Sequence, residues 1–224
     1  MMTHDIKGPL SVISGYAEIL MQKVADEELS VMAGEILKAG GRISTLIGEM
    51  LDLSKMEEGK AKIDYSPLYI REILDQAVKE AEADAAVKNV RLKLIVDDDI
   101  GTVTVDRMLL MRAVGNLVGN AVKYNRWGGA VTVRAENYGG DRVMIEVSDT
   151  GTGIPPEDLP HIFDKYYRSP KTGGIVGTGL GLAIVKAVAE AHGGSVGARS
   201  TESQGSTFTI ILPKNPADSD RKAA

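Results

Sequence analysis

Three polar side chains recur on one stripe of an otherwise apolar segment, at Asn116, Asn120 and Lys123. On a helix these positions are i, i+4 and i+7, so two amides and one ammonium group share a face. Amide oxygens are suitable ligands for Mg²⁺, which keeps several waters and takes few protein groups, and a lysine supplies a point charge for a phosphate. The pattern predicts a magnesium-bridged nucleotide as partner. Hydrogen bonding to neighbouring backbone would account for either asparagine separately, but it accounts poorly for three polar residues on one apolar helix.

Two glycine clusters follow along the chain, at residues 149–153 (DTGTG) and 177–181 (GTGLG). Glycines let the backbone approach phosphates closely, and the free amides at a helix N-terminus attract anions. The second cluster runs directly into a predicted helix. Neither cluster has the Lys-Ser/Thr ending of a P-loop or the strand-to-helix placement of a dinucleotide fingerprint. Each cluster alone is weak evidence, because such a loop is more often an ordinary turn.

The first 57 residues carry the heptad pattern of two helices, separated by an acidic break at residues 26–28. Each helix carries two interleaved seven-residue series of apolar residues, and a single antiparallel helix pair cannot cover both series. Pairing with a second copy as a four-helix bundle is the common solution. We therefore predict a homodimer through this helical hairpin, with packing of the hairpin on its own downstream domain as the alternative. The positions of one series are Ile6, Ile13, Leu20, Leu29, Ile36, Ile43 and Met50, interleaved in the first helix with Leu10, Ala17 and Val24.

The rest of the chain alternates between helical and strand periodicity, which predicts an α+β fold with helices over one mixed sheet. We assign 1–57 to a dimerisation hairpin, 58–66 to a linker, 67–214 to a globular domain and 215–224 to a flexible tail. Asp106 is the predicted N-cap of the helix that carries the three polar residues. The predicted helices are 71–87, 106–124 and 180–191, and the predicted strands are 91–97, 102–106, 130–136, 142–149, 195–200 and 206–212.

Composition excludes several classes of partner. The formal net charge is -5 with acidic and basic residues interspersed, so no basic footprint for nucleic acid is present. The chain has no cysteine, and its three histidines are not at metal-ligand spacing. No apolar run approaches the roughly 20 residues that span a bilayer. We expect a cytoplasmic segment without membrane contact of its own, cut from a parent protein whose upstream part could hold a sensor or membrane anchor.

Five sequence elements, in order, resemble the boxes of the sensor histidine kinases of two-component systems, and the resemblance covers residues 4–213. The family has a two-helix dimerisation and phosphotransfer domain followed by an ATP-binding domain shared with gyrase-type ATPases. The elements are the phosphoacceptor box from His4 to Leu10, the asparagine box at 116–125, the two glycine boxes, the phenylalanine box between them (Ile162-Phe163 with Tyr167-Arg168) and the closing Gly-Thr element at 205–208.

The resemblance implies that His4 is the nucleophile, attacking the γ-phosphorus of ATP through Nε2. Such attack needs a neutral imidazole, and a histidine with an ordinary pKa is largely neutral near pH 7. Asp5 is implied as the group that takes or holds the other ring proton. The alternative for His4, an ordinary exposed histidine near a frayed end, would be preferred without the downstream boxes. Gly8 stands where family members that dephosphorylate their regulator carry Thr or Asn, so weak or absent phosphatase activity is expected.

The resemblance also implies a nucleotide pocket in which Asp149 accepts a hydrogen bond from the adenine amino group. Asn120 is implied as a Mg²⁺ ligand, Asn116 as a metal or water-shell neighbour and Lys123 as a phosphate contact. Residues 164–176 would form a lid over ATP, with Arg168 either contacting the γ-phosphate or remaining a solvated charge. His161 and His192 are interpreted as structural. The remaining implied nucleotide-binding residues are Tyr124, Gly151, Gly153, Gly177, Gly179, Leu180, Gly181 and Thr207.

The function expected from the resemblance is ATP- and Mg²⁺-dependent autophosphorylation of His4, followed by transfer to an aspartate on the receiver domain of a response regulator. A hydrolytic ATPase or chaperone of the gyrase-like superfamily is a second hypothesis, but those proteins typically carry Glu where this chain has Asn116, since a carboxylate can activate water. A non-catalytic nucleotide-binding scaffold is a third. A lost histidine or a damaged glycine box would be expected for it, and neither is found.

Overall fold

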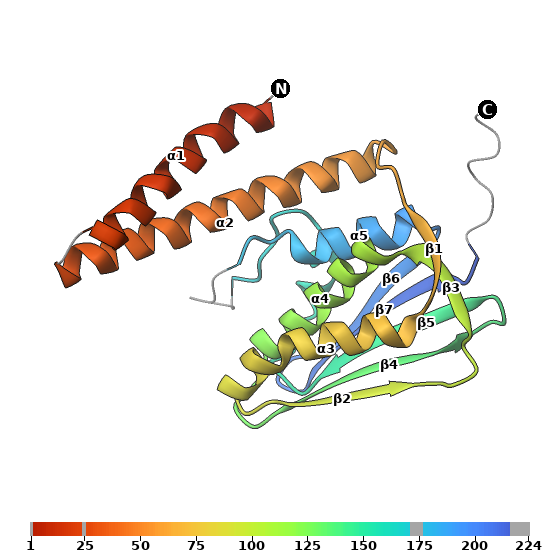
Figure 1. Cartoon of the computed structure of the whole chain (residues 1–224). Coiled ribbons are helices and arrows are strands. Elements are labelled where there is room, and N and C mark those ends of the chain that lie inside the picture. The colour runs from red at the N-terminus through yellow and green to blue at the C-terminus, as the bar shows by residue number, and fades with distance from the viewer. Residues whose placement is uncertain (1, 24–25, 171–176, 216–224) are drawn as a thin grey trace. The chain divides into compact units, whose positions relative to one another are not determined.

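The computed structural model describes residues 2–23, 26–170 and 177–215, with side chains from residue 10 to 22 in the first of these ranges. The chain divides into two units, Met1–Lys55 and Met56–Ala224. Their elements are labelled in chain order in Figure 1. Within the described residues, no helix combines the length and the apolar character needed to cross a membrane.

The first unit is an antiparallel hairpin of α1 (Met2–Lys23) and α2 (Glu27–Glu57). The acidic break predicted between the helices contains the N-cap of α2, because Asp26 Oδ1 accepts hydrogen bonds from the amides of Glu28 (2.9 Å) and Leu29 (3.2 Å). A Cβ at Gly40 would lie 3.0 Å from Ser14 Oγ, so the two helices approach closely at that point. The side chains buried along this seam are Leu10, Ala17 and Ala33.

The heptad series of the hairpin remains largely exposed. Ile36 and Ile43, for example, are 44% and 45% exposed. The buried seam within the hairpin is therefore a different stripe from the larger apolar series, which a single hairpin leaves uncovered. Ile6 and Val24 lie outside the described side chains. The exposed members of the series are Ile13, Leu20, Leu29, Ile36, Ile43 and Met50.

The second unit is built on a five-stranded sheet with strand order β2-β4-β5-β7-β6. Only the β2–β4 pair is parallel. Helices α3, α4 and α5 lie over one face of this sheet (Figure 1). The bounds are α3 (Ile70–Val87), β2 (Arg91–Val96), α4 (Arg107–Lys123), β4 (Ala130–Tyr138), β5 (Arg142–Asp149), a short 3₁₀ turn η1 (Leu159–His161), α5 (Gly181–Ala191), β6 (Ser195–Thr201) and β7 (Gly205–Pro213).

The helical and strand elements predicted for the globular part are present, but the pattern predicts one sheet and the chain forms two. β1 (Tyr65–Tyr69) pairs with β3 (Thr102–Asp106) in a separate antiparallel ribbon. β1 begins inside the segment predicted as linker and contains Pro67. It lacks a clear alternation of buried and exposed residues because it is short and mostly exposed, so periodicity gave no signal there.

Helix α4 is oriented by its cap and its core face. Asp106 is the N-cap, as predicted: its Oδ1 accepts hydrogen bonds from the amides of Met108 and Leu109, both at 3.0 Å. Seven small or aliphatic side chains of α4 are buried against the rest of the unit, which turns the polar stripe away from the core. These buried residues are Leu110, Ala113, Val114, Leu117, Val118, Ala121 and Val122.

His192 follows the last turn of α5 and is only 1% exposed. Its Nδ1 lies 2.8 Å from the Val188 carbonyl oxygen, and its Nε2 accepts a hydrogen bond of 3.0 Å from the Asp106 amide. The edge of its ring faces the ring of Tyr65, with 5.5 Å between centroids. These contacts support the structural role predicted for this histidine.

Acid is expected to destabilise the second unit through His192. Burial lowers the pKa of this imidazole below its usual 6.5, although the hydrogen bond to the Val188 carbonyl and, less strongly, the nearby Asp106 carboxylate oppose the shift. Between the lowered pKa and 6.5 the unfolded state therefore binds more protons, so the free energy of unfolding falls as the pH drops below about 6.5. Urea denaturation at several pH values should show this slope in the wild type and a smaller slope in His192→Gln. Equal slopes would contradict the prediction.

Candidate functional site

The polar stripe of α4 faces the start of α5. Asn116 and Asn120 are half-buried. Asn116 Nδ2 donates a hydrogen bond of 3.2 Å to the carbonyl oxygen of Gly181, which is the first residue of α5. This bond uses the amide nitrogen and leaves the Asn116 oxygen available as an acceptor. Across the described part of the chain, the side chain of Asn120 has no hydrogen-bond partner.

The end of α4 meets the second glycine cluster. The ammonium group of Lys123 lies 5.1 Å from the ring centroid of Tyr124, which caps the helix. A Cβ at Gly177 would lie 2.8 Å from Lys123 Nζ and 4.0 Å from Tyr124 Oη. Lys123 has no ion-pair partner among the residues that the structure describes. The structure thus brings together the predicted phosphate lysine and the predicted phosphate loop.

The second glycine cluster forms the entry to α5. Leu180 is buried and is the N-cap position, and its amide donates to Thr178 Oγ1 at 3.1 Å. Gly179 has a φ of +72°, and a Cβ there would lie 2.7 Å from the backbone carbon of Tyr166. The first amides of a helix have no partner within the helix, so the start of α5 offers donors to an anion.

The first glycine cluster surrounds the carboxylate of Asp149, at the end of β5. Asp149 Oδ1 accepts a hydrogen bond of 2.7 Å from the Gly151 amide. Burial raises the pKa of Asp149, while hydrogen bonds from the backbone amides of Gly151 and Ser206 act in the opposite direction. The result is a partly desolvated carboxylate held in place by backbone donors. Such a group is suited to accept a hydrogen bond from a ligand.

Gly151 and Gly153 are required by close backbone packing. A Cβ at Gly151 would lie 2.5 Å from the Tyr124 carbonyl oxygen, which also accepts a hydrogen bond of 3.1 Å from the Thr152 amide. Gly153 has a φ of +66°, and its Cβ would lie 2.0 Å from the Thr201 carbonyl oxygen. This loop therefore joins the end of α4 to the turn between β6 and β7.

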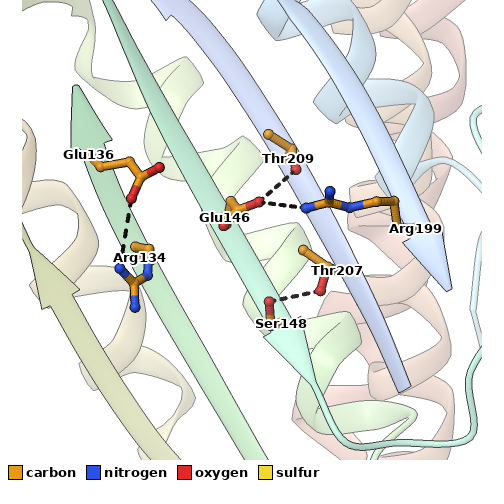
Figure 2. Close-up of polar contacts among 7 residues, drawn as sticks. All are labelled: Arg134, Glu136, Glu146, Ser148, Arg199, Thr207 and Thr209. Carbon is orange, nitrogen blue, oxygen red and sulfur yellow. Dashed lines mark hydrogen bonds and ion pairs between the residues drawn. The ribbon is translucent and has the colours of Figure 1, made fainter. Parts of the chain in front are cut away.

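Thr207 is the predicted pocket residue that the structure places elsewhere. Its hydroxyl lies 2.9 Å from Ser148 Oγ on the sheet face opposite the helices (Figure 2). Glu146 lies on the same face, where its Oε1 accepts from Arg199 and Thr209. Side chains alternate across a strand, so the neighbours of Thr207 face inward instead. The side chain of Thr207 is therefore not part of the Asp149 group.

Ser206 and Ser200 occupy the place expected for Thr207, and motif matching missed both. Ser206 is buried, its amide donates to Asp149, and its hydroxyl lies 2.9 Å from Ser200 Oγ. Ser200 Oγ also accepts a hydrogen bond of 2.8 Å from the Ile154 amide. The period-two alternation of residues 206–212 could have identified Ser206 as the inward-facing residue, because Ser206 lies two positions before the apolar Phe208 and therefore on the same face of the strand.

The segment predicted as a lid is described only in part. Phe163 packs edge to face against Phe208 of β7, with 6.5 Å between ring centroids. Arg168 is exposed, as is His161, whose Nδ1 lies 3.1 Å from a carboxylate oxygen of Asp164. Lys171, Gly173 and Gly174 lie outside the described residues. His4 and Asp5 belong to α1 by their backbone, and their side chains are likewise outside the description.

Two family models match the chain. Residues 1–59 match the His Kinase A (phospho-acceptor) domain, and residues 105–216 match the histidine kinase-, DNA gyrase B-, and HSP90-like ATPase family. The second match spans half of the chain.

Curated relatives match nearly the whole of this chain and extend beyond the matched region. The sensor-like histidine kinase SenX3 of Mycolicibacterium smegmatis is 33% identical over 96% of this chain and 56% of its own length. The sensor histidine kinase ZraS of Salmonella typhi is 32% identical over 95% and 44%. The non-motile and phage-resistance protein of Caulobacter vibrioides is 31% identical over 97% and 27%. The chain thus spans between 27% and 56% of the length of these relatives.

Solved structures of histidine kinases have the same fold. Full-length ShkA in complex with AMPPNP superposes with a TM-score of 0.84 at 28% identity, covering 95% of this chain and 44% of that one. The mycobacterial sensor histidine kinase MprB gives a TM-score of 0.60 at 29% identity, covering 68% of this chain and 99% of that one. The family predicted from the five ordered motifs is confirmed, and the chain belongs to the sensor histidine kinases of two-component systems.

Proposed function

We propose that this chain transfers the γ-phosphoryl group of ATP to its own His4 and then to an aspartate on the receiver domain of a response regulator. The observation that carries the proposal is the convergence of the α4 stripe on the glycine cluster of α5. Asn116 bonds to Gly181, and Lys123 closely approaches Gly177. The phosphoacceptor match at residues 1–59, which includes His4, distinguishes a kinase from a hydrolytic ATPase of the same superfamily.

The proposed nucleotide orientation follows from the chemistry at the two ends of the site. The Asp149 carboxylate is an acceptor, so it would receive the amino group of adenine and discriminate against guanine, which presents a carbonyl there. Tyr124 connects the two ends of the site, because its carbonyl oxygen accepts a hydrogen bond from the Thr152 amide of the first glycine loop and its ring lies beside Lys123. The phosphates would then meet Lys123 and the amides at the start of α5.

Mg²⁺ fits the residues present. Asn120 offers a half-buried amide without a hydrogen-bond partner in the described part of the chain, and Asn116 retains a free oxygen after its amide nitrogen is bonded. Oxygen ligands of this type and small number suit a magnesium ion that also binds phosphate oxygens and water. We propose Asn120 as a ligand and Asn116 as a ligand or a partner of its water shell. When bound, the ion would neutralise phosphate charge.

In the proposed first step, His4 Nε2 attacks the γ-phosphorus, the bond from that phosphorus to the bridging oxygen breaks, and ADP leaves. Asp5 holds the Nδ1 proton, which keeps Nε2 unprotonated and stabilises positive charge on the ring. A loose transition state requires alignment and charge neutralisation more than covalent assistance. The protein's contribution is therefore to hold the phosphates against Lys123 and α5 while the histidine is presented. In the second step an aspartate oxygen takes the phosphoryl group from His4.

We also propose that the hairpin forms a homodimer as a four-helix bundle and that the receiver domain docks on it near His4. The exposed heptad series on α1 and α2 supports the dimer, because six large apolar side chains at that spacing would otherwise face water. In this scheme residues 1–57 form the dimerisation and phosphotransfer domain, 58–66 the linker, whose last two residues begin β1, and 67–214 the ATP-binding domain.

Incubation with γ-labelled ATP and Mg²⁺ tests the proposed function. We expect protein-bound label that is acid-labile and base-stable in the wild type, and no such label in His4→Ala. The matched control is His161→Ala, which removes an exposed histidine and should keep the label. Release of free phosphate without labelled protein would favour an ATPase. The absence of both free phosphate and labelled protein would favour a scaffold. Either result would overturn the proposal.

A further inference from the structure

Helices α4 and α5 are joined by polar contacts at both ends. At one end Asn116 Nδ2 donates to the carbonyl oxygen of Gly181, the first residue of α5. At the other end the amide of Asp106, the N-cap of α4, donates to Nε2 of His192, the C-cap of α5. The two helices are therefore antiparallel neighbours (Figure 1). One contact lies at the candidate nucleotide site and the other lies about ten residues away along each helix.

The hydrogen bonds of His192 require one tautomer. The Val188 carbonyl can only accept, so Nδ1 carries the proton that it receives. The Asp106 amide can only donate, so Nε2 must be unprotonated. The two ring nitrogens thus have separate tasks. Nδ1 makes a hydrogen bond within the last turn of α5, whereas Nε2 makes a hydrogen bond that connects α5 to α4.

The contact at Asp106, like the one at Asn116, gives direction to a helix interface that is apolar between these two ends. The buried side chains that α4 and α5 contribute are mainly Ala, Val, Leu and Ile. Apolar contacts of this kind are non-directional, so they resist sliding of one helix along the other less specifically than a hydrogen bond does. A slip of one residue moves a helix by about 1.5 Å. A misplacement of about 1 Å at a reacting site can cost on the order of 100-fold in rate.

We propose that His192 is a positioning residue for nucleotide binding: its Nε2 fixes the register of α4 against α5 and so keeps Asn116 and Asn120 opposite the glycine cluster at 177–181. This inference rests on the proposed function only in taking ATP as the ligand. It goes beyond a structural role for His192, because it assigns the effect to one ring nitrogen and predicts a change in nucleotide affinity.

Two substitutions separate the tasks of the two ring nitrogens. In His192→Asn the side-chain amide nitrogen can occupy the place of Nδ1, which keeps the bond to Val188 and leaves the Asp106 amide without an acceptor. In His192→Gln the side-chain oxygen can reach the place of Nε2, which keeps an acceptor for Asp106. Both substitutions shorten or reshape a buried ring, so both are expected to lower the melting temperature.

The test is calorimetric titration with a non-hydrolysable ATP analogue and Mg²⁺, well below the melting temperature of each variant. We expect His192→Asn to raise Kd at least about 10-fold and His192→Gln to stay within about 3-fold of the wild type. Unchanged Kd values in both variants would reduce His192 to a stabilising residue, and equal weakening in both would remove the role of Nε2. Either result overturns the inference, whereas a wild type that does not bind the analogue overturns the proposed function itself.

A second measurement needs no variant and covers the case in which His192→Asn does not fold. Because coupling is reciprocal, the ATP analogue should strengthen the bond between Asp106 and His192. Hydrogen exchange of the Asp106 amide should therefore slow at least about 10-fold more than that of the Asp97 amide, which bonds to Ala135 within the sheet region. Equal slowing of the two amides would contradict the inference.

Discussion

Replacing Asp149 by asparagine is expected to weaken binding of an ATP analogue by roughly 10- to 100-fold, because a hydrogen bond to a charged acceptor contributes on the order of 1.5–3 kcal/mol. In the wild type the carboxylate accepts from the Gly151 and Ser206 amides. It retains acceptor capacity for the amino group of adenine. An asparagine has one oxygen for these donors, and its NH₂ group would face at least one of them.

The matched control for Asp149→Asn is Glu146→Gln, three positions earlier on β5. Glu146 makes its polar contacts with Arg199 and Thr209 on the sheet face away from the helices (Figure 2), so its neutralisation should leave nucleotide affinity within about 2-fold. Calorimetric titration measures both affinities. Retention of wild-type affinity in Asp149→Asn would show that this carboxylate does not bind the base.

Substituting Gly153 by alanine is expected to destabilise the second unit by about 3 kcal/mol or more, through two effects that add. The new Cβ would lie 2.0 Å from the Thr201 carbonyl oxygen and 2.8 Å from the Thr201 carbonyl carbon, so backbone rather than a flexible side chain has to move. The residue is also held at a φ of +66°, which a side chain disfavours. The loop that holds Asp149 would be displaced together with the turn between β6 and β7.

The control for Gly153→Ala is Gly197→Ala, since no heavy atom lies within 4 Å of a Cβ built at Gly197 and its φ lies outside the left-handed range. This substitution should change the free energy of unfolding by less than about 0.5 kcal/mol. Differential scanning calorimetry of the whole chain reports both values as shifts of the transition of the second unit. Equal transitions for the two variants would show that the loop at Gly153 accommodates a side chain without strain.

The features that could be predicted from the sequence are those that short-range spacing determines. Asn116, Asn120 and Lys123 share a stripe because α4 is helical, and Asp106 begins that helix because its carboxylate caps the next amides. Composition and spacing within about ten residues carry this information.

The features that could not be predicted depend on partners far apart in the chain. The bond between His192 and Asp106 joins residues 86 positions apart, and β1 is a strand only because β3 pairs with it. Thr207 shows a different limit. The motif identified the stretch of β7 that approaches Asp149, but the alternation of the strand directs Ser206 to Asp149 and Thr207 to the other face.

The linker is hydrogen-bonded to the N-cap residue of α4, so a force on the linker would act on that end of the helix. The Asp64 amide donates to Asp106 Oδ2 at 3.0 Å, so the chain arriving from α2 is tied to the N-cap of α4. Asn120 lies fourteen residues further along, which is about 21 Å of helix. With the N-cap as pivot, a tilt of α4 by about 5° would move Asn120 by about 2 Å. A small torque at the linker end of α4 would therefore become a displacement of atomic size among the groups that we propose meet the phosphates.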